Sequence, residues 1–148
     1  PHGCTMTNFH LGAFAGDAAL ESQTSTPDIG GQLTSWQVRA HRFDGGNNVR
    51  MGTSSGLSVP FAPMPRHVIG VRDADGNQYA YGSSIVPVTD SQVPTTGLPT
   101  ALYGLRAQTT YSDDLVKMLH AGAALSVGQA RDLISILSRV NRIATLLS

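Results

Sequence analysis

The stretch TTYSDDLVKMLHAGAALSVGQARDLISILSRV, from Thr109 to Val140, changes the character of the chain. The sequence before it alternates between apolar and polar residues and is broken by turns, whereas here the apolar residues recur at helical spacing. Ser112, followed by Asp113 and Asp114, is typical of a helix start, because these side chains cap free backbone N–H groups and suit the positive helix terminus. The stretch predicts two helices, a helical hairpin over residues 112–148.

The first predicted helix carries the apolar stripe Leu115, Met118 and Leu119 and ends at Gly122 or in the alanine-rich segment after it. The second begins at Ser126, where SVGQ fits a capping box with Gln129 at the third helical position. Its apolar residues recur at spacings of three and four residues, which is the pattern of a helix-packing stripe of about three heptads. These residues are Ala130, Leu133, Leu137, Val140, Ala144 and Leu147, widened by Ile136 and Ile143.

Two interpretations of this stripe stay open. The helix can pack on the sheet of its own chain, or it can pack against another subunit. A helix of about 22 residues spans roughly 33 Å, which is longer than a small sheet needs and favours some overhang onto a neighbour. Leu137→Asp would place a charge in the stripe, so we expect it to break assembly or folding.

Upstream of the helices the sequence predicts strands and turns. SWQVRAHRF and NVRMGTS, within Ser35 to Ser54, form one predicted hairpin, and RHVIGVR and QYAYGSS, joined by the turn DADGN, form another. TNFHLGAF, from Thr7 to Phe14, alternates like a short strand, and Thr100 to Tyr111 can form the last strand. The predicted fold class is α+β: an antiparallel, hairpin-rich sheet followed by a C-terminal two-helix hairpin.

The length of 148 residues suits one domain. Within it we distinguish an N-terminal arm over residues 1–31, a β-rich body over 35–111 and the helical hairpin over 112–148. A loop-rich arm of this length needs another surface to lie on.

The charged residues are few and of unusual kinds. Lys117 and Glu21 are the single lysine and glutamate, the formal net charge is zero, and charged residues make up 14% of the chain. Isolated domains generally keep apart with Lys and Glu on their surface, so this composition favours a surface covered by neighbours. A GC-rich genome explains the dominance of arginine over lysine equally well. The neutral balance argues against general binding to polyanions, although a local basic patch is compatible with it.

The sequence predicts neither a membrane span nor a secreted, disulfide-bonded domain. It contains no run of about 18 apolar residues, and its start lacks a charged segment followed by an apolar core, so we expect no signal peptide. We expect Pro1 to be the residue left after an initiator methionine is trimmed. Cys4 is the single cysteine, which excludes an internal disulfide and favours a reducing compartment.

Candidate chemical sites are sparse. His2, Cys4 and His10 offer too few closely spaced ligands for a metal site, and a solvated terminus explains them as well. His41, His67 and His120 belong to different elements, and the chain lacks the GxSxG, GxxxxGK[ST] and GxGxxG motifs that would give them a catalytic setting. DADGN resembles the start of a calcium loop, but Ser84 stands where a glutamate is required. We expect no catalytic residue, no metal and no cofactor.

Three arginines are candidates for a nucleic-acid face. Arg39 lies on one predicted strand, and Arg66 and Arg72 lie on another. Arginines aligned on a sheet can hold phosphates without reading bases. Ordinary solvation, or pairing with the abundant aspartates, is the alternative.

The segment TTYSDDLVKMLHAGAAL, Thr109 to Leu125, resembles the junction of last strand and capped helix in the coat proteins of single-stranded RNA bacteriophages. The order of strands followed by two helices resembles the same family. The resemblance implies that two subunits interlock their helices over a joint sheet whose inner face contacts RNA. The helix stripe from Leu115 to Leu147 would then be the dimer contact, with Arg39, Arg66 and Arg72 facing RNA. The long second helix, the near absence of lysine and the proline-broken strands depart from the family.

These observations predict a non-enzymatic, self-assembling structural protein of a virus particle, most simply a phage coat subunit. Its partners would be copies of itself, other virion proteins and conceivably nucleic acid, and it would assemble in the host cytoplasm. A phage decoration, connector or tail component is one alternative, and a small β-rich ligand-binding module is another. The predicted subunit interface comprises Leu115, Leu119, Leu133, Leu137, Val140, Ala144 and Leu147.

Overall fold

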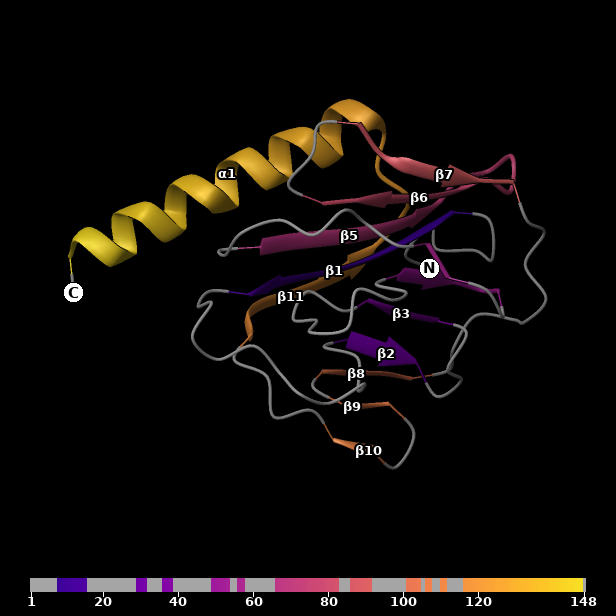
Figure 1. Ribbon diagram of the computed structural model, residues 1–148, viewed down its shortest axis with the longest axis horizontal. Coiled ribbons are helices and arrows are strands. Elements are labelled where there is room, and N and C mark those ends of the chain that lie inside the picture. The colour runs from indigo at the N-terminus through magenta and orange to yellow at the C-terminus, as the bar shows by residue number, and fades with distance from the viewer. Residues whose placement is uncertain are drawn as a thin grey trace.

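The structure is a computed structural model in which two antiparallel sheets pack face to face and one helix covers the outer face of the larger sheet (Figure 1). It describes residues 8–15, 29–31, 36–38, 49–53, 56–57, 66–82, 86–91, 101–104, 106–107, 110–111 and 116–147. Residues 16–28 of the predicted N-terminal arm and residues 39–48 of the first predicted hairpin lie outside these residues.

The larger sheet has five strands in the order β11-β1-β5-β6-β7, and each neighbouring pair is antiparallel. Its second strand comes from the predicted N-terminal arm, which here forms an interior strand of the sheet. The strands are β1 (Phe9–Ala15), β5 (Arg66–Arg72), β6 (Gln78–Tyr81), β7 (Val88–Asp90) and β11 (Val116–Gly122).

The smaller sheet has four short strands in the order β4-β3-β2-β8, and a separate pair, β9 with β10, lies beside it in Figure 1. The predicted pairing of the Trp36 and Val49 segments is confirmed, because β3 and β4 form an antiparallel pair. The strands are β2 (Ile29–Gly31), β3 (Trp36–Val38), β4 (Val49–Met51), β8 (Leu102–Gly104), β9 (Arg106–Ala107) and β10 (Thr110–Tyr111).

The prediction of a two-helix hairpin is wrong, because the segment that we expected to form its first helix is a strand. Val116–Gly122 is β11, which pairs along its length with β1. Leu119 turns toward the core, while Met118 and His120 turn to the other face, as a strand requires. The fold is therefore mostly β with one C-terminal helix. Ser112 to Leu115, the expected start of that helix, lies outside the described residues.

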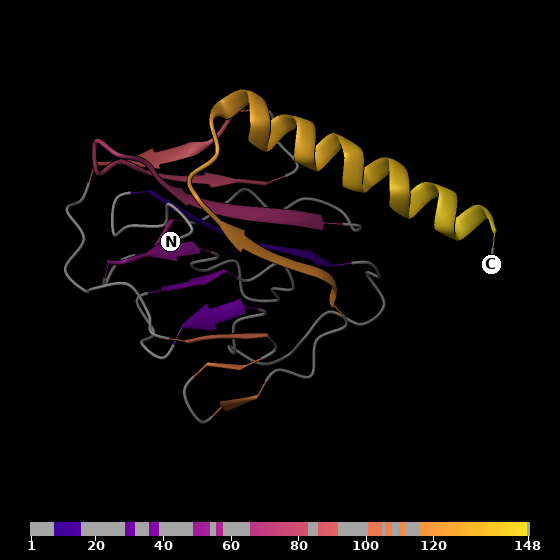
Figure 2. The same cartoon turned by 180° about the vertical axis from the view of Figure 1, so that it is seen from behind.

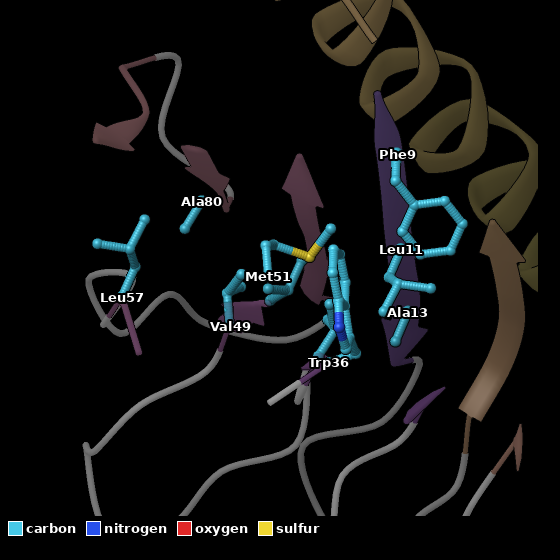
Figure 3. Close-up of a cluster of buried hydrophobic side chains, with 10 residues drawn as sticks. Phe9, Leu11, Ala13, Trp36, Val49, Met51, Leu57 and Ala80 are labelled. Carbon is cyan, nitrogen blue, oxygen red and sulfur yellow. The ribbon is translucent and has the colours of Figure 1, made fainter. Parts of the chain in front are cut away.

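The main hydrophobic core fills the space between the two sheets. Trp36, which is fully buried, packs edge-on against Phe9 with ring centroids 5.5 Å apart. Figure 3 shows Trp36 between Met51 and the side chains of β1. The predicted alternation in β1 is confirmed: Phe9, Leu11 and Ala13 face this core, and the residues between them face the opposite side. Each sheet thus contributes one apolar face.

The hairpin of β5 and β6 is confirmed, and its turn follows from DADGN. Asp73 N–H donates to the carbonyl oxygen of Asn77, and the Asp73 carboxylate accepts from the backbone N–H groups of Asp75 and Asn77 at 3.0 and 2.9 Å. Gly76 has a φ of 85°, in the region that glycine adopts without strain. Local side-chain bonds and one glycine therefore close the loop.

The second predicted helix is confirmed as α1, Val127–Leu146. Its capping box is formed: Gln129 N–H donates to Ser126 Oγ at 3.2 Å, and Ser126 N–H donates to Gln129 Oε1 at 2.9 Å. Two backbone donors at the helix start are thereby satisfied by two side chains, as the sequence predicts.

Ser126→Ala is expected to lower the free energy of unfolding by about 1 kcal/mol, because it leaves one of these donors without its acceptor. Urea unfolding followed by circular dichroism measures the change. Ser135→Ala, in the exposed middle of α1, removes a serine that caps nothing and should leave stability equal or slightly raised. Equal losses in both variants would contradict a capping role for Ser126.

The helix covers only part of the sheet. Its first half packs on the outer face of β5 and β6, where Ala130 is fully buried against Ile69, Val71 and Tyr81. Its second half continues past the ends of the strands, as Figures 1 and 2 both show. Packing on the sheet of its own chain is therefore confirmed for the first half of α1, and packing of the second half against another subunit stays a prediction.

Candidate functional site

The projecting half of α1 presents a continuous apolar face to solvent. Ile136, Val140 and Ile143 expose 54%, 52% and 58% of their surface, and Leu147, just after the helix, exposes 83%. Their spacing of four, three and four residues places them in one row along the helix. Single exposed aliphatic residues are ordinary on protein surfaces, but a contiguous row of this kind is typical of an interaction site.

An apolar groove adjoins this row where the projecting helix leaves the sheet. It holds about 190 Å³ and lies between α1 and the strands β1 and β11. Phe14 and Met118 form its sheet side, and Leu137, Val140 and Ala144 form much of its helix side. The exposed row and the apolar groove share Val140. They therefore form one surface that can receive apolar side chains from a partner.

The structure distributes the predicted interface residues over two environments. Leu119 packs against the core between the sheets, and Leu133 and Leu137 pack toward the sheet of their own chain. Val140 and Leu147 are exposed and belong to the row, and Ala144 is exposed beside it. Leu115 lies outside the described residues. The exposed surface also includes Ile136 and Ile143, which the sequence marks only as residues that widen the stripe.

The three candidate arginines are not brought together by the described structure. Arg72 is fully buried, and its guanidinium donates to the carbonyl oxygens of Met51 and Gly76, with Nε at 2.9 Å from Met51 O. Burial lowers its pKa, an effect that Asp90 and Asp73 oppose. A guanidinium at this depth ties the two sheets together and cannot reach an external phosphate. Arg66 begins β5, and Arg39 lies outside the described residues.

Three histidines form a hydrogen-bonded chain on the outer face of the larger sheet. His10 Nδ1 lies 2.6 Å from the carbonyl oxygen of Ala123, and His10 Nε2 lies 3.2 Å from His120 Nδ1. His120 Nε2 lies 2.8 Å from His67 Nε2. The three come from β1, β11 and β5, so the chain crosses three adjacent strands; we call it the histidine chain.

Glycine at position 12 makes room for this chain. Gly12 pairs with His120 across β1 and β11, and a Cβ at Gly12 would lie 2.0 Å from Cε1 of the His120 ring. The ring therefore lies directly over the backbone of β1, between His10 and His67. Phe14 lies at the His67 end of the histidine chain, with its ring edge-on to His67 at a centroid distance of 5.7 Å.

Burial holds these imidazoles neutral. It is the largest cause that lowers the pKa of His67 to about 3, with the neighbouring His120 and His10 adding to the effect. It likewise lowers the pKa of His120 to about 4, and His10 contributes there as well. The pKa of His10 is lowered by burial, against which the bond to Ala123 acts. The interpretation of His10 as part of a solvated terminus is therefore wrong.

The histidine chain does not have the geometry of a metal site. His120 uses its two ring nitrogens toward different partners, so the nitrogens point along a line instead of converging on one point. Among the described residues no group of three or more His, Cys, Asp or Glu is arranged to hold a metal ion. His2, Cys4 and His41 lie outside that part of the chain. Sequence reasoning missed the cluster because its members are distant in sequence.

A second, polar hollow of about 470 Å³ lies beside the β5–β6 turn, lined by Asn77, Tyr79, Thr89, Asp90 and Ser91. The Tyr79 hydroxyl donates to Asp73 at 2.8 Å, and this bond is the largest cause that raises the pKa of Tyr79. The hollow is open, and Asn77, Tyr79 and Asp90 in its lining already bond side chains outside it, so it indicates no particular ligand.

No protein-family model, curated protein or solved structure matches this chain. Within the described residues, no helix has both the length and the apolar character needed to cross a membrane.

Proposed function

We propose that this protein is a non-enzymatic structural subunit that assembles with copies of itself through the projecting half of α1. The observation that carries the proposal is the row Ile136, Val140, Ile143 and Leu147, exposed on a helix that extends beyond its own sheet. Burying a half-exposed aliphatic side chain contributes on the order of 1 kcal/mol. A matched row from a second copy doubles the number of side chains removed from water.

A second copy suits this surface because two copies of α1 can pack side by side in antiparallel orientation, in which the two helix dipoles oppose each other. The four-three-four spacing of the row is also the spacing by which two helices pack side by side. Such a contact is isologous and closes as a two-fold dimer.

The setting that we propose for this assembly is a virus particle, with the protein as a phage coat subunit. The scarcity of lysine and glutamate, which favours a surface covered by neighbours, supports it. The resemblance to phage coat proteins does not, because it relied on a first helix where the chain forms β11. A decoration, connector or tail component would use the same helix surface and is the alternative. Nucleic-acid contact through Arg39 and Arg66 stays a prediction, and Arg72 is not part of it.

Expression of the chain alone, followed by gradient sedimentation, electron microscopy and the ratio of absorbance at 260 and 280 nm, tests this setting. Closed particles that carry nucleic acid are expected for a coat subunit. Particles, rings or tubes free of nucleic acid would instead favour the decoration, connector or tail role. Dimers that never grow, at any concentration or salt, would contradict the particle while leaving self-association intact.

A further inference from the structure

The directions of the hydrogen bonds in the histidine chain follow from one carbonyl group. The oxygen of Ala123 can only accept, so His10 Nδ1, at 2.6 Å, carries a hydrogen. In a neutral imidazole the other nitrogen then has a lone pair. His10 Nε2 is therefore an acceptor, and His120 Nδ1 must be the donor across their 3.2 Å contact.

The same reasoning passes through His120 to the far end. Since His120 Nδ1 carries its hydrogen, His120 Nε2 accepts, and His67 Nε2 donates to it at 2.8 Å. This leaves His67 Nδ1 as a lone pair, and that atom is buried without a hydrogen-bond partner among the described residues. Every nitrogen of the three rings therefore has a defined role at neutral pH.

A chain of this kind has no place for an added proton. A proton on His10 Nε2 or His120 Nε2 would set two N–H groups against each other at hydrogen-bond distance. A proton on His67 Nδ1 would place a charge and an unpaired donor in the interior, on a residue that is 2% exposed. Proton uptake thus requires the rings to separate.

The surroundings supply no compensating negative charge. The other ionisable side chains described on α1 are Arg131, Asp132, Arg139 and Arg142, and those on or beside this sheet face are Asp73, Tyr79 and Tyr81. The groups that affect the pKa of the three histidines are each other and the carbonyl of Ala123. The side chains of Arg66 and Lys117 are not described. Phe14 and Met118, near the His67 end of the histidine chain, are apolar.

The histidine chain also fixes the connection from β11 to α1. His10 holds the carbonyl of Ala123, and the N–H of Ala124 donates to Asn8 Oδ1 at 2.7 Å. Both residues lie between the last strand and Ser126, where the helix is capped. A change in the rings therefore acts directly on the segment that sets the helix on the sheet.

We propose that the histidine chain is a pH-sensitive contact. It holds β11 and the start of α1 on the sheet at neutral pH and releases them on acidification. The proposal concerns the folded single chain and does not depend on self-association. Its pH window follows from the direction of the pKa shifts. Histidine in an unfolded chain titrates near pH 6.5, whereas here burial lowers the pKa of His67 to about 3 and of His120 to about 4.

At a pH between the lowered pKa values of the native histidines and the unfolded value near 6.5, the released or unfolded chain binds more protons than the native fold. The stability that the neutral histidines contribute is therefore complete above about pH 6.5 and is lost as the pH falls from there toward about 4. Most aspartates titrate at the lower end of this window or below it, so loss of structure in its upper part reports on the histidines.

Nitrogen-15 NMR of the histidine side chains tests the starting state. At pH 7.5 the two-bond nitrogen–proton spectrum is expected to show hydrogen on Nδ1 for His10 and His120 and on Nε2 for His67. Hydrogen on Nε2 in all three rings, the common form in water, would overturn the proposed chain. So would a doubly protonated ring.

An acid titration tests the release. Helix circular dichroism and the fluorescence of Trp36 are measured from pH 8 to pH 4 on the wild type and on His67→Gln/His120→Gln. Glutamine can both donate and accept but does not titrate, so the double variant is expected to shift the transition midpoint about one pH unit lower and to reduce its steepness. An unchanged midpoint and slope would overturn the proposal.

His2→Gln/His41→Gln is the comparison variant, because it removes the same number of imidazoles while His10, His67 and His120 stay unchanged. Its midpoint is expected to equal that of the wild type. A shift in the control as large as that in His67→Gln/His120→Gln would overturn the assignment of the effect to these three residues. If His67→Gln/His120→Gln loses its fold at pH 7.5, His120→Gln alone is titrated, and its transition midpoint is expected to shift in the same direction.

Discussion

Gly12→Ala is expected to lower the free energy of unfolding by about 3 kcal/mol, a large effect for one methyl group. The added carbon would lie 2.0 Å from the His120 ring, far inside contact distance. The ring cannot simply turn away, because hydrogen bonds to His10 and His67 hold it on both sides. Relief of the clash breaks these bonds and leaves buried nitrogens without hydrogen-bond partners, which adds to the free-energy cost of overpacking.

Urea unfolding at pH 7.5, followed by Trp36 fluorescence, measures this change. Gly128→Ala is the matched control: a Cβ there lies 3.9 Å from the nearest atom, Ser126 Oγ, and the residue is exposed in α1. Alanine favours helix over glycine, so the control should gain up to about 1 kcal/mol. A loss below about 0.5 kcal/mol in Gly12→Ala would contradict the close contact of His120 with β1.

Val140→Asp/Ile143→Asp is expected to abolish self-association while the chain stays folded. Both side chains are more than half exposed in the single chain, so the carboxylates remain hydrated there. In the proposed dimer they would be buried in an apolar contact without partners, at a cost of several kcal/mol. Sedimentation velocity measures the association, and circular dichroism measures the fold.

Two comparisons make this result specific. Gly128→Asp/Ser135→Asp adds the same charge to exposed positions of α1 outside the row, and it should leave association unchanged. Leu137→Asp alters a residue that is 8% exposed, so it should destabilise the chain itself by several kcal/mol. Association that survives in Val140→Asp/Ile143→Asp would exclude the row as the contact.

The features that the sequence predicts correctly are those set by neighbouring residues. The β5–β6 hairpin combines two-residue alternation with a turn in which Asp73 and Gly76 do the local work. The start of α1 follows from Ser126 and Gln129, three residues apart. At the hairpin and at the helix start, secondary-structure propensity, capping and tertiary structure agree. A short window of sequence is therefore enough to predict the local structure.

β11 shows where such a window fails. Met118 and Leu119 fit a helical stripe with Leu115 before them, and a short apolar run is ambiguous between helix and strand. The structure is decided by β1, about a hundred residues earlier, whose edge pairs with Val116–Gly122 through its backbone. Tertiary pairing overrides a local helix preference, and no pattern within the segment reveals the partner.

The histidine chain was beyond prediction for a related reason. The alternation in β1 does place His10 and Gly12 on the face opposite the core, and the structure confirms it. That face is buried only because α1 lies over part of it and β11 places His120 beside β1, and the sequence did not predict that strand. Gly12 is a local signal in the sequence, because a glycine inside a strand pattern marks a bulge or a close approach by another group.

Copies of this chain are expected to associate through the projecting half of α1. Light scattering coupled to size-exclusion chromatography, at pH 7.5 and over a hundredfold range of concentration, measures this association. A mass of at least twice the 15.6 kDa of the single chain is expected, and it should fall to 15.6 kDa in Val140→Asp/Ile143→Asp. A mass of 15.6 kDa for the unaltered chain at every concentration would show that it does not self-associate.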